Sequence, residues 1–191
     1  MLKTKIINYL FLSSILFFVG ACGNTYSPKP HAYFRIDFPE KEYQQYLSEC
    51  PYTFSYPVYA DIVYNNKESC WIDVNYTEFN ANIHITYRKI GNNIVENLED
   101  ARTLAYKHTV KADAIDEKLF NNFEAKVHGV LYDIKGNAAS SVQFFVTDSV
   151  NNFLRGALYF NVNPNKDSLA PVVEFIKQDI IHLIETFEWK E

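Results

Sequence analysis

The sequence predicts a single α+β domain in which a mostly antiparallel sheet is flanked by helices, and three observations lead to this prediction. Predicted strands and helices follow one another in the order strands, helix, strands, helix. The connections between successive strands are short enough for hairpins, which favours antiparallel pairing. The 191 residues are 48% hydrophobic and 16% aromatic, which is enough apolar side chain to fill the core of one domain.

The N-terminus, residues 1–21, is predicted to be a lipoprotein signal peptide. Two lysines precede an apolar run from Ile6 to Val19, which is shorter than the ~20 residues that span a bilayer. The run ends in Val19-Gly20-Ala21-Cys22. This pattern resembles a bacterial lipobox, in which small residues precede the cysteine that receives the lipid. We therefore expect a lipid, such as palmitate, on Cys22.

Removal of the signal peptide leaves a lipidated tether over residues 22–30 and a globular domain over residues 31–191. Acyl chains would hold this domain at a membrane of the cell envelope. No acidic run follows Cys22, which favours a position facing the periplasm. The sequence leaves open whether the membrane is the inner leaflet of the outer membrane or the cytoplasmic membrane.

Cys50 and Cys70 are candidates for a disulfide bond. An even pair of cysteines in an oxidising compartment favours such a bond. However, each cysteine comes directly before a predicted strand, so a simple hairpin would not place them opposite one another. Two buried thiols are the alternative.

The first half of the domain is predicted to be a short helix followed by strands. The helix is expected between Asp37 and Leu47, and the aromatic and β-branched residues from Tyr52 to Val63 predict a strand. Apolar and polar residues alternate over Cys70 to Tyr76 and again over Asn82 to Arg88. This alternation predicts an antiparallel hairpin with one buried face.

A helix is predicted next, from Asn93 to Lys111. Asn93 and Glu96 form a capping-box-like pair at its start, and acidic residues at the start with basic residues at the end match the helix dipole. The pattern over residues 113–122 is ambiguous.

Three strands and a final helix complete the predicted domain. The strands are expected over Phe123 to Lys135, Ser140 to Asp148 and Phe153 to Val162. Ser168 is the expected cap of the last helix, whose apolar residues recur at helical spacing up to Phe187. These apolar residues are Leu169, Val172, Val173, Ile176, Ile180, Leu183 and Phe187. The other face of this helix is expected to be exposed, and it carries Glu174, Lys177, Gln178 and Glu185.

Motifs of catalysis, nucleotide binding and metal binding are missing from the sequence. It contains no G-x-S-x-G elbow, no phosphate-binding loop and no G-x-G-x-x-G turn. Its five histidines lie too far apart for zinc-type spacing. A net charge of −5 disfavours nucleic-acid binding, which needs a basic surface. We therefore predict no catalytic residues, no metal and no cofactor.

A few polar residues remain as candidates for a chemical site assembled in space. Asp73 and Glu78 could face one another across a hairpin end, and Asp133 lies among apolar residues. His84 lies on the predicted strand that pairs with the strand of Asp73, and His128 lies on the same predicted strand as Asp133. Solvated or structural side chains are the alternative for each of them.

Tyrosines are concentrated near the start of the domain. Eight of the 14 tyrosines fall between Tyr26 and Tyr64. Tyrosine has a large apolar body and a polar tip, so it suits protein interfaces and sugar stacking as well as cores. Core packing, a protein interface and glycan binding therefore all stay open for this segment.

The segment from Pro28 to Glu40, close behind the predicted lipobox, resembles the gliding motility lipoprotein GldD family. The resemblance continues over Cys50 to Pro57, Gly129 to Ala139 and Phe144 to Phe160, so it covers essentially the whole mature chain. The chain has His-Ala at positions 31 and 32, where the family commonly has Arg-Gly. The order of strands and helices also resembles the PsbP/Mog1-like α/β/α sandwich, which is a likeness of fold only.

This resemblance implies a non-enzymatic lipoprotein of the gliding motility machinery and of the linked type IX secretion of proteins through the cell envelope. Its expected partners are other gliding or secretion lipoproteins, together with the membrane that holds its anchor. Within the first motif, the candidate interaction residues are Tyr33, Phe34, Arg35 and Asp37. The alternative is a periplasmic glycan-binding lipoprotein or an enzyme whose site is assembled from strand residues.

Overall fold

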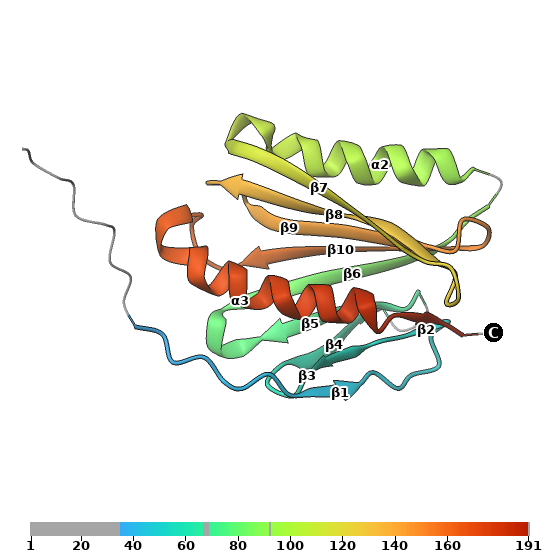
Figure 1. Ribbon diagram of the computed structural model, residues 1–191, viewed down its shortest axis with the longest axis horizontal. Helices are drawn as coiled ribbons and strands as arrows, with labels where there is room; N and C mark the ends of the chain where they lie inside the picture. Colours follow the sequence, from blue (N-terminus) through green and yellow to red (C-terminus); the bar gives the residue numbers. More distant parts are fainter. Residues whose placement is uncertain (1–34, 67–68, 92, 191) are drawn as a thin grey trace, which may run out of the picture. The chain divides into compact units, whose positions relative to one another are not determined.

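A computed structural model describes residues 35–66, 69–91 and 93–190 of the chain (Figure 1). Seven strands form the central sheet in the order β4-β5-β6-β10-β9-β8-β7, and all neighbouring pairs are antiparallel. This sheet confirms the predicted α+β class. The strands are β4 Asp61–Asn66, β5 Trp71–Tyr76, β6 Ala81–Lys89, β7 Ala112–Asn122, β8 Val127–Gly136, β9 Ser140–Thr147 and β10 Asn152–Phe160.

Helices α2 (Ile94–Tyr106) and α3 (Lys166–Glu185) pack against opposite faces of this sheet. Successive residues of a strand point to opposite faces, so neighbouring residues of β9 and β10 belong to different cores. Phe144 and Leu154 pack in the core under α3, whereas Phe145 and Phe153 pack in the core under α2. In Figure 1, α3 crosses in front of the central strands and α2 runs along the β7 side of the sheet. Within the described ranges, no helix is long and apolar enough to cross a membrane.

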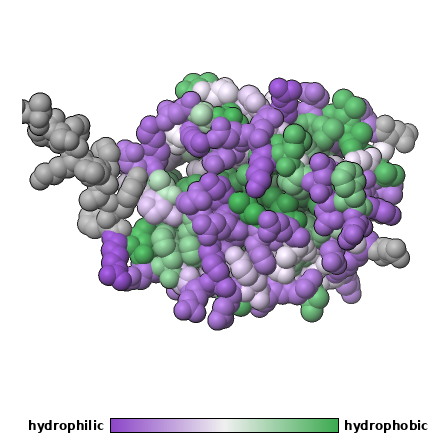
Figure 2. All heavy atoms as spheres, in the orientation of Figure 1, coloured by the Kyte–Doolittle hydropathy of each residue, from purple (hydrophilic) through white to green (hydrophobic). Residues whose placement is uncertain are grey.

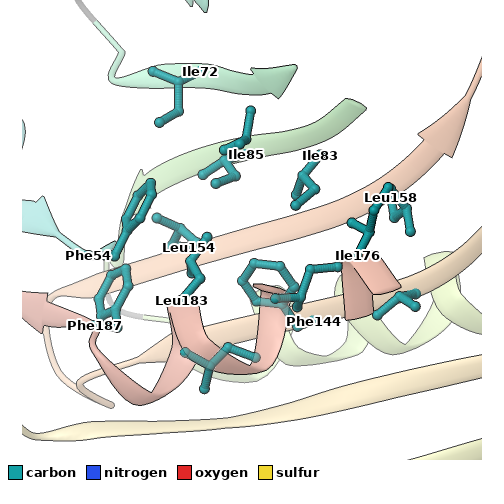
Figure 3. Packing of buried hydrophobic residues seen from close by; sticks show 14 of the residues in the cluster. Phe54, Ile72, Ile83, Ile85, Phe144, Leu154, Leu158, Ile176, Leu183 and Phe187 are labelled. Carbon is teal, nitrogen blue, oxygen red and sulfur yellow. The ribbon is translucent and has the colours of Figure 1, made fainter. Parts of the chain in front are cut away.

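The core under α3 is the larger of the two. Figure 3 shows Ile176 and Leu183 of α3 directed toward the strand residues that face this helix. These strand residues include Ile83, Leu154 and Leu158, which are at most 1% exposed. Figure 2 shows the same side of the molecule from outside, with hydrophilic side chains over most of its surface and a group of hydrophobic side chains near its centre.

Residues 36–60, which we call the N-terminal strap, lie against this larger core. The strap contains β1 (Tyr43–Gln45), β2 (Tyr52–Thr53) and β3 (Ser55–Pro57). β1 pairs with β3, and β2 pairs with β11 (Glu188–Trp189), which follows α3. Tyr46, Tyr52 and Phe54 of the strap are buried in the core. The sequence left core packing, a protein interface and glycan binding open for the tyrosines of this segment. Tyr46 and Tyr52 pack in the core.

Two sequence predictions for the strap are wrong. The expected helix between Asp37 and Leu47 does not form, because Tyr43–Gln45 pairs with β3 as a strand and tertiary pairing overrides the local pattern. The single strand expected from Tyr52 to Val63 is divided among β2, β3 and β4. Pro57 ends β3, and a turn leads from it into β4.

Element boundaries differ elsewhere, too. The strand expected to begin at Phe123 begins at Val127 instead, because residues 123–126 form the hairpin turn before β8. The ambiguous segment 113–122 lies in β7, an edge strand of the sheet. The last helix is capped by Asn165 and not by Ser168, whose backbone N–H donates to the Asn165 side chain. The predicted cap of the other helix is confirmed, since the Asn93 side chain accepts from the backbone N–H of Glu96.

Candidate binding site beside helix α2

The face of the sheet that carries α2 is only partly covered. Ala101 and Ala105 of α2 are buried together with side chains of β8, β9 and β10. On the β5 and β6 side of this face, alternate residues are polar and reach solvent to different degrees. This polar surface continues onto β10 and β9. We call it the open sheet face and define it by Asp73, His84, Thr86, Arg155 and Tyr159, together with the buried Gln143. The alternation in the sequence produces it, because the apolar residues between these positions point toward α3.

Asp73 and His84 form a hydrogen-bonded pair on the open sheet face. They are register partners on β5 and β6, and His84 Nδ1 lies 2.6 Å from Asp73 Oδ1. Asn65 Nδ2 donates to the same carboxylate oxygen over 2.6 Å, and the Tyr159 ring lies 5.4 Å from the His84 ring. A carboxylate in this position fixes the orientation of an imidazole, as it does for histidines that act as general bases.

Arg155 and Gln143 form a second pair on this face, and the sequence analysis missed both. Arg155 Nη2 donates to Gln143 Oε1 over 2.5 Å. Gln143 is 1% exposed, and its Nε2 has no hydrogen-bond partner among the described residues. Burial lowers the pKa of the Arg155 guanidinium, and the positive charge of Arg88 lowers it further. The available signal was a lone arginine in the apolar run of β10.

A cleft of about 140 Å³ lies between α2 and the strands β6 and β10. Thr86 and Arg88 of β6 line it together with Phe153 and Arg155 of β10. On the helix side it is lined by Asn97, Asp100, Ala101 and Leu104. Arg88 and Asp100 face each other across it at 3.6 Å, with both side chains more than half exposed. We call this hollow the α2 cleft.

The other polar candidates from the sequence, Asp133, Glu78 and His128, make their contacts away from the Asp73–His84 pair. Asp133 lies on the opposite face of the sheet, half-buried, and pairs with Lys177 Nζ of α3 at 3.1 Å. Lys177 is therefore largely buried, which corrects its expected place on the exposed side of the last helix. Glu78 is exposed on the short turn after β5 and does not face Asp73 across the hairpin. His128 contacts Asn121 at 3.1 Å.

The residues of the first family motif fall at the edge of the described chain. Arg35 and Asp37 form an exposed ion pair of 2.9 Å with each other. Exposed ion pairs contribute little to stability, so this pair leaves both side chains available to a partner. Tyr33, Phe34 and the predicted lipid site Cys22 lie outside the described residues.

Cys50 and Cys70 are joined by a disulfide, with their Cα atoms 5.7 Å apart. The hairpin argument against this bond does not apply, because Cys50 lies in the strap and not in the central sheet. The bond therefore fastens the strap to the start of β5. Within the described ranges, no group of three or more His, Cys, Asp or Glu side chains is placed to hold a metal ion.

Asp179 of α3 is a further residue that the sequence analysis missed, and it holds the strap from the other side. Its side chain is fully buried and accepts hydrogen bonds from Lys41 Nζ at 2.6 Å, Tyr43 at 3.0 Å and Tyr59 at 2.9 Å. We call these four residues the strap lock. Burial raises the pKa of Tyr43 to about 12, and the negative charge of Asp179 adds to this. Burial lowers the pKa of Lys41 more than its bond to Asp179 raises it.

Comparison with known families gives a match that covers most of the chain. The sequence profile described as "Gliding motility lipoprotein GldD" matches residues 23–189. A comparison with curated proteins finds no match. The family match includes the strap, the sheet and both helices, so the open sheet face and the strap lock both lie within it.

Proposed function

Because the chain belongs to the gliding motility lipoprotein GldD family, we propose that it is a non-enzymatic component of the gliding machinery. The family match over residues 23–189 carries this proposal, since it includes nearly all of the predicted mature protein. We extend the proposal to the linked type IX secretion of proteins. In both roles the protein acts through contacts with other motility or secretion lipoproteins.

Its location follows from the anchor. A lipoprotein is held at a membrane by acyl chains, so the chain is a membrane-anchored protein of the cell envelope. We place the lipid, palmitate among its acyl chains, on Cys22 and the domain in the periplasm. The motif Val19-Gly20-Ala21-Cys22 supports the lipid site, and the disulfide between Cys50 and Cys70 fits an oxidising compartment.

The open sheet face supports a binding role. It presents a carboxylate, an imidazole, a guanidinium and hydroxyl groups on one side of the sheet, where the His84 side chain is 45% exposed and Arg155 lines the α2 cleft. Side chains on a sheet are held in fixed positions, which favours selective contacts with a partner.

A second candidate function is favoured by the pair of Asp73 and His84. A histidine oriented by a carboxylate is a common arrangement for proton transfer, so the pair supports an enzyme or a glycan-binding protein with its site on the open sheet face. In such an enzyme, His84 would take a proton from water or from a substrate group.

One set of variants separates the two functions. Asp73→Asn and His84→Gln are introduced into cells, with His128→Gln as the matched control for a surface histidine that contacts an asparagine. Protein abundance and colony spreading are measured together for each variant. For a binding protein, loss of movement accompanies loss of protein or loss of the partner lipoproteins that co-purify with it. Normal abundance and unchanged co-purified partners, with complete loss of movement in the first two variants, would establish the chemical site instead.

Partner contact is tested by placing a photo-crosslinking amino acid at position 84 in intact cells. Position 178, exposed on the α3 side of the domain, serves as the control. Crosslinks from position 84 to other motility or secretion lipoproteins, identified by mass spectrometry, are the expected result. Equal crosslinking from both positions would contradict selective contact through the open sheet face.

A further inference from the structure

We propose that the α2 cleft binds a carboxylate group carried by a peptide segment of a partner protein, with Arg155 as the anion-binding side chain. This inference rests on the proposed binding function and deepens it, because it names the chemistry of the partner.

Arg155 is a cation without a carboxylate partner among the described residues. Its guanidinium donates to Gln143, a neutral amide, and also interacts with the Tyr159 hydroxyl, while Arg88 is a second positive charge near it. A guanidinium has five N–H donors in a planar fork, so neutral partners at Gln143 and Tyr159 leave donors for an anion. A partly buried charge without a counter-charge is unfavourable, and an incoming anion would remove this penalty.

The charges of the cleft select a singly charged ligand. Arg88 and Arg155 supply two positive charges, and Asp100 supplies one negative charge opposite Arg88. The cleft thus has a net charge of about +1, which one carboxylate neutralises. A phosphate monoester carries a charge of about −1.5 to −2 and would also be repelled by Asp100. A planar carboxylate also fits the fork of a guanidinium with two parallel bonds.

The size and lining of the cleft favour one side chain of a peptide. Its volume of about 140 Å³ is below the range of roughly 300–1,000 Å³ that whole small-molecule ligands occupy. Phe153 and Leu104 provide apolar walls for the methylene groups of a glutamate or aspartate. Thr86 and Asn97 offer a hydroxyl and an amide at the same cleft. These groups suit an acidic side chain or a chain terminus.

Gln143 is a positioning residue in this arrangement. Its buried amide oxygen accepts from Nη2 of Arg155 and thereby fixes the guanidinium against the sheet. A guanidinium held in one orientation loses less side-chain freedom when the ligand binds. Replacement of Gln143 by Leu should therefore weaken binding while leaving the charge of the site unchanged.

The experiment follows the side-chain Nε–Hε signal of Arg155 by NMR on the whole chain, solubilised in detergent. The probe is glutamate with an acetylated amino group and an amidated backbone carboxyl, so that only the side-chain carboxylate remains. The same glutamine derivative is the neutral control, and inorganic phosphate is the dianion control. We expect a saturable shift with the glutamate probe, none with the glutamine probe and weaker binding of phosphate.

Variants assign the binding to the cleft, with the backbone amide of Thr86 as their reporter. Arg155→Gln should bind the glutamate probe roughly tenfold more weakly, and Arg155→Lys should lie between it and the native chain. Arg102→Gln is the matched control, because Arg102 lies on α2 but stacks on the Tyr106 ring outside the cleft. Circular dichroism verifies that each variant is folded.

Three results would overturn the proposal: no saturable shift of the Arg155 signal in the folded native chain, tighter binding of phosphate than of the glutamate probe, or equal weakening by Arg102→Gln. Failure of the proposed function would look different. Loss of movement in His84→Gln, at normal protein abundance and with unchanged co-purified partners, would indicate chemistry at the Asp73–His84 pair, whether or not the carboxylate probe binds in the α2 cleft.

Discussion

Replacing Asp179 with asparagine removes the negative charge of the strap lock and changes the shape of the side chain very little. Removal of one partner of a buried ion pair costs about 3–5 kcal/mol, because the other charge is left uncompensated. Lys41 keeps 25% of its side chain exposed, so its ammonium can turn partly to water. The amide oxygen of an asparagine still accepts from Tyr43 and Tyr59. We therefore expect Asp179→Asn to lower the free energy of unfolding by about 3 kcal/mol, at the lower end of this range.

The assay is urea unfolding followed by circular dichroism, with Lys41→Met and the double variant measured alongside. If the ion pair causes the loss, Asp179→Asn should cost much less when Lys41 is already methionine. The expected coupling is about 2 kcal/mol, within the range for residues in direct contact. Limited proteolysis should also cut the strap of Asp179→Asn faster than that of the native chain, because the lock holds strap residues to α3.

The matched control is Glu185→Gln, an exposed acid in the last turn of the same helix. It should change the free energy of unfolding by no more than about 0.5 kcal/mol. The reasoning is refuted if Asp179→Asn is as mild as this control, or if the losses from Asp179→Asn and Lys41→Met simply add.

Three further predictions concern the core, the disulfide and alkaline pH. Ile180 is fully buried, so Ile180→Ala should cost about 2–5 kcal/mol in urea unfolding, whereas Gln178→Ala on the exposed side should stay within about 0.5 kcal/mol. Replacing both cysteines of the disulfide with serine should lower the free energy of unfolding by roughly 3 kcal/mol, and native protein whose two thiols are alkylated without reduction would contradict the bond. The raised pKa values of Tyr43 and Tyr46, each about 12, give stability that is complete below about pH 10 and lost as the pH rises through about 12. The lowered pKa of Lys41 acts in the opposite direction, so urea midpoints that rise steadily above pH 10 would show that the tyrosines do not control alkaline unfolding.

The parts of the fold that the sequence predicted are those with a regular hydrophobic period. β5 and β6 follow the alternation of the hairpin, and α3 follows the helical spacing that includes Ile176 and Ile180. The strap was misjudged because its short strands exist only through partners elsewhere in the chain. β2 pairs with β11, which is more than 130 residues away, and no local pattern contains that information.

The candidate site was predicted in part for the same reason. Asp73 and His84 were named from the sequence, and the register of β5 and β6 explains why they meet. Asp133, another predicted candidate, does not belong to this site, because it points to the other face of the sheet and pairs there with Lys177 of α3. Arg155 was not predicted, because the apolar residues around it indicate a buried strand and a single arginine does not identify a ligand.

Asp179 and Arg155 nevertheless share a signal that a sequence contains. Each is a charged residue at a position where the surrounding pattern is apolar, Asp179 between Ile176 and Ile180 and Arg155 between Leu154 and Gly156. Burial of a charge without partners costs several kcal/mol. A charged residue at a position that the apolar pattern predicts to be buried therefore implies a partner for that charge. For Asp179 the partners come from the strap, up to 138 residues away in the chain. For Arg155 the described residues provide an amide but no carboxylate, and the same physical argument therefore directs the search for its partner to another molecule.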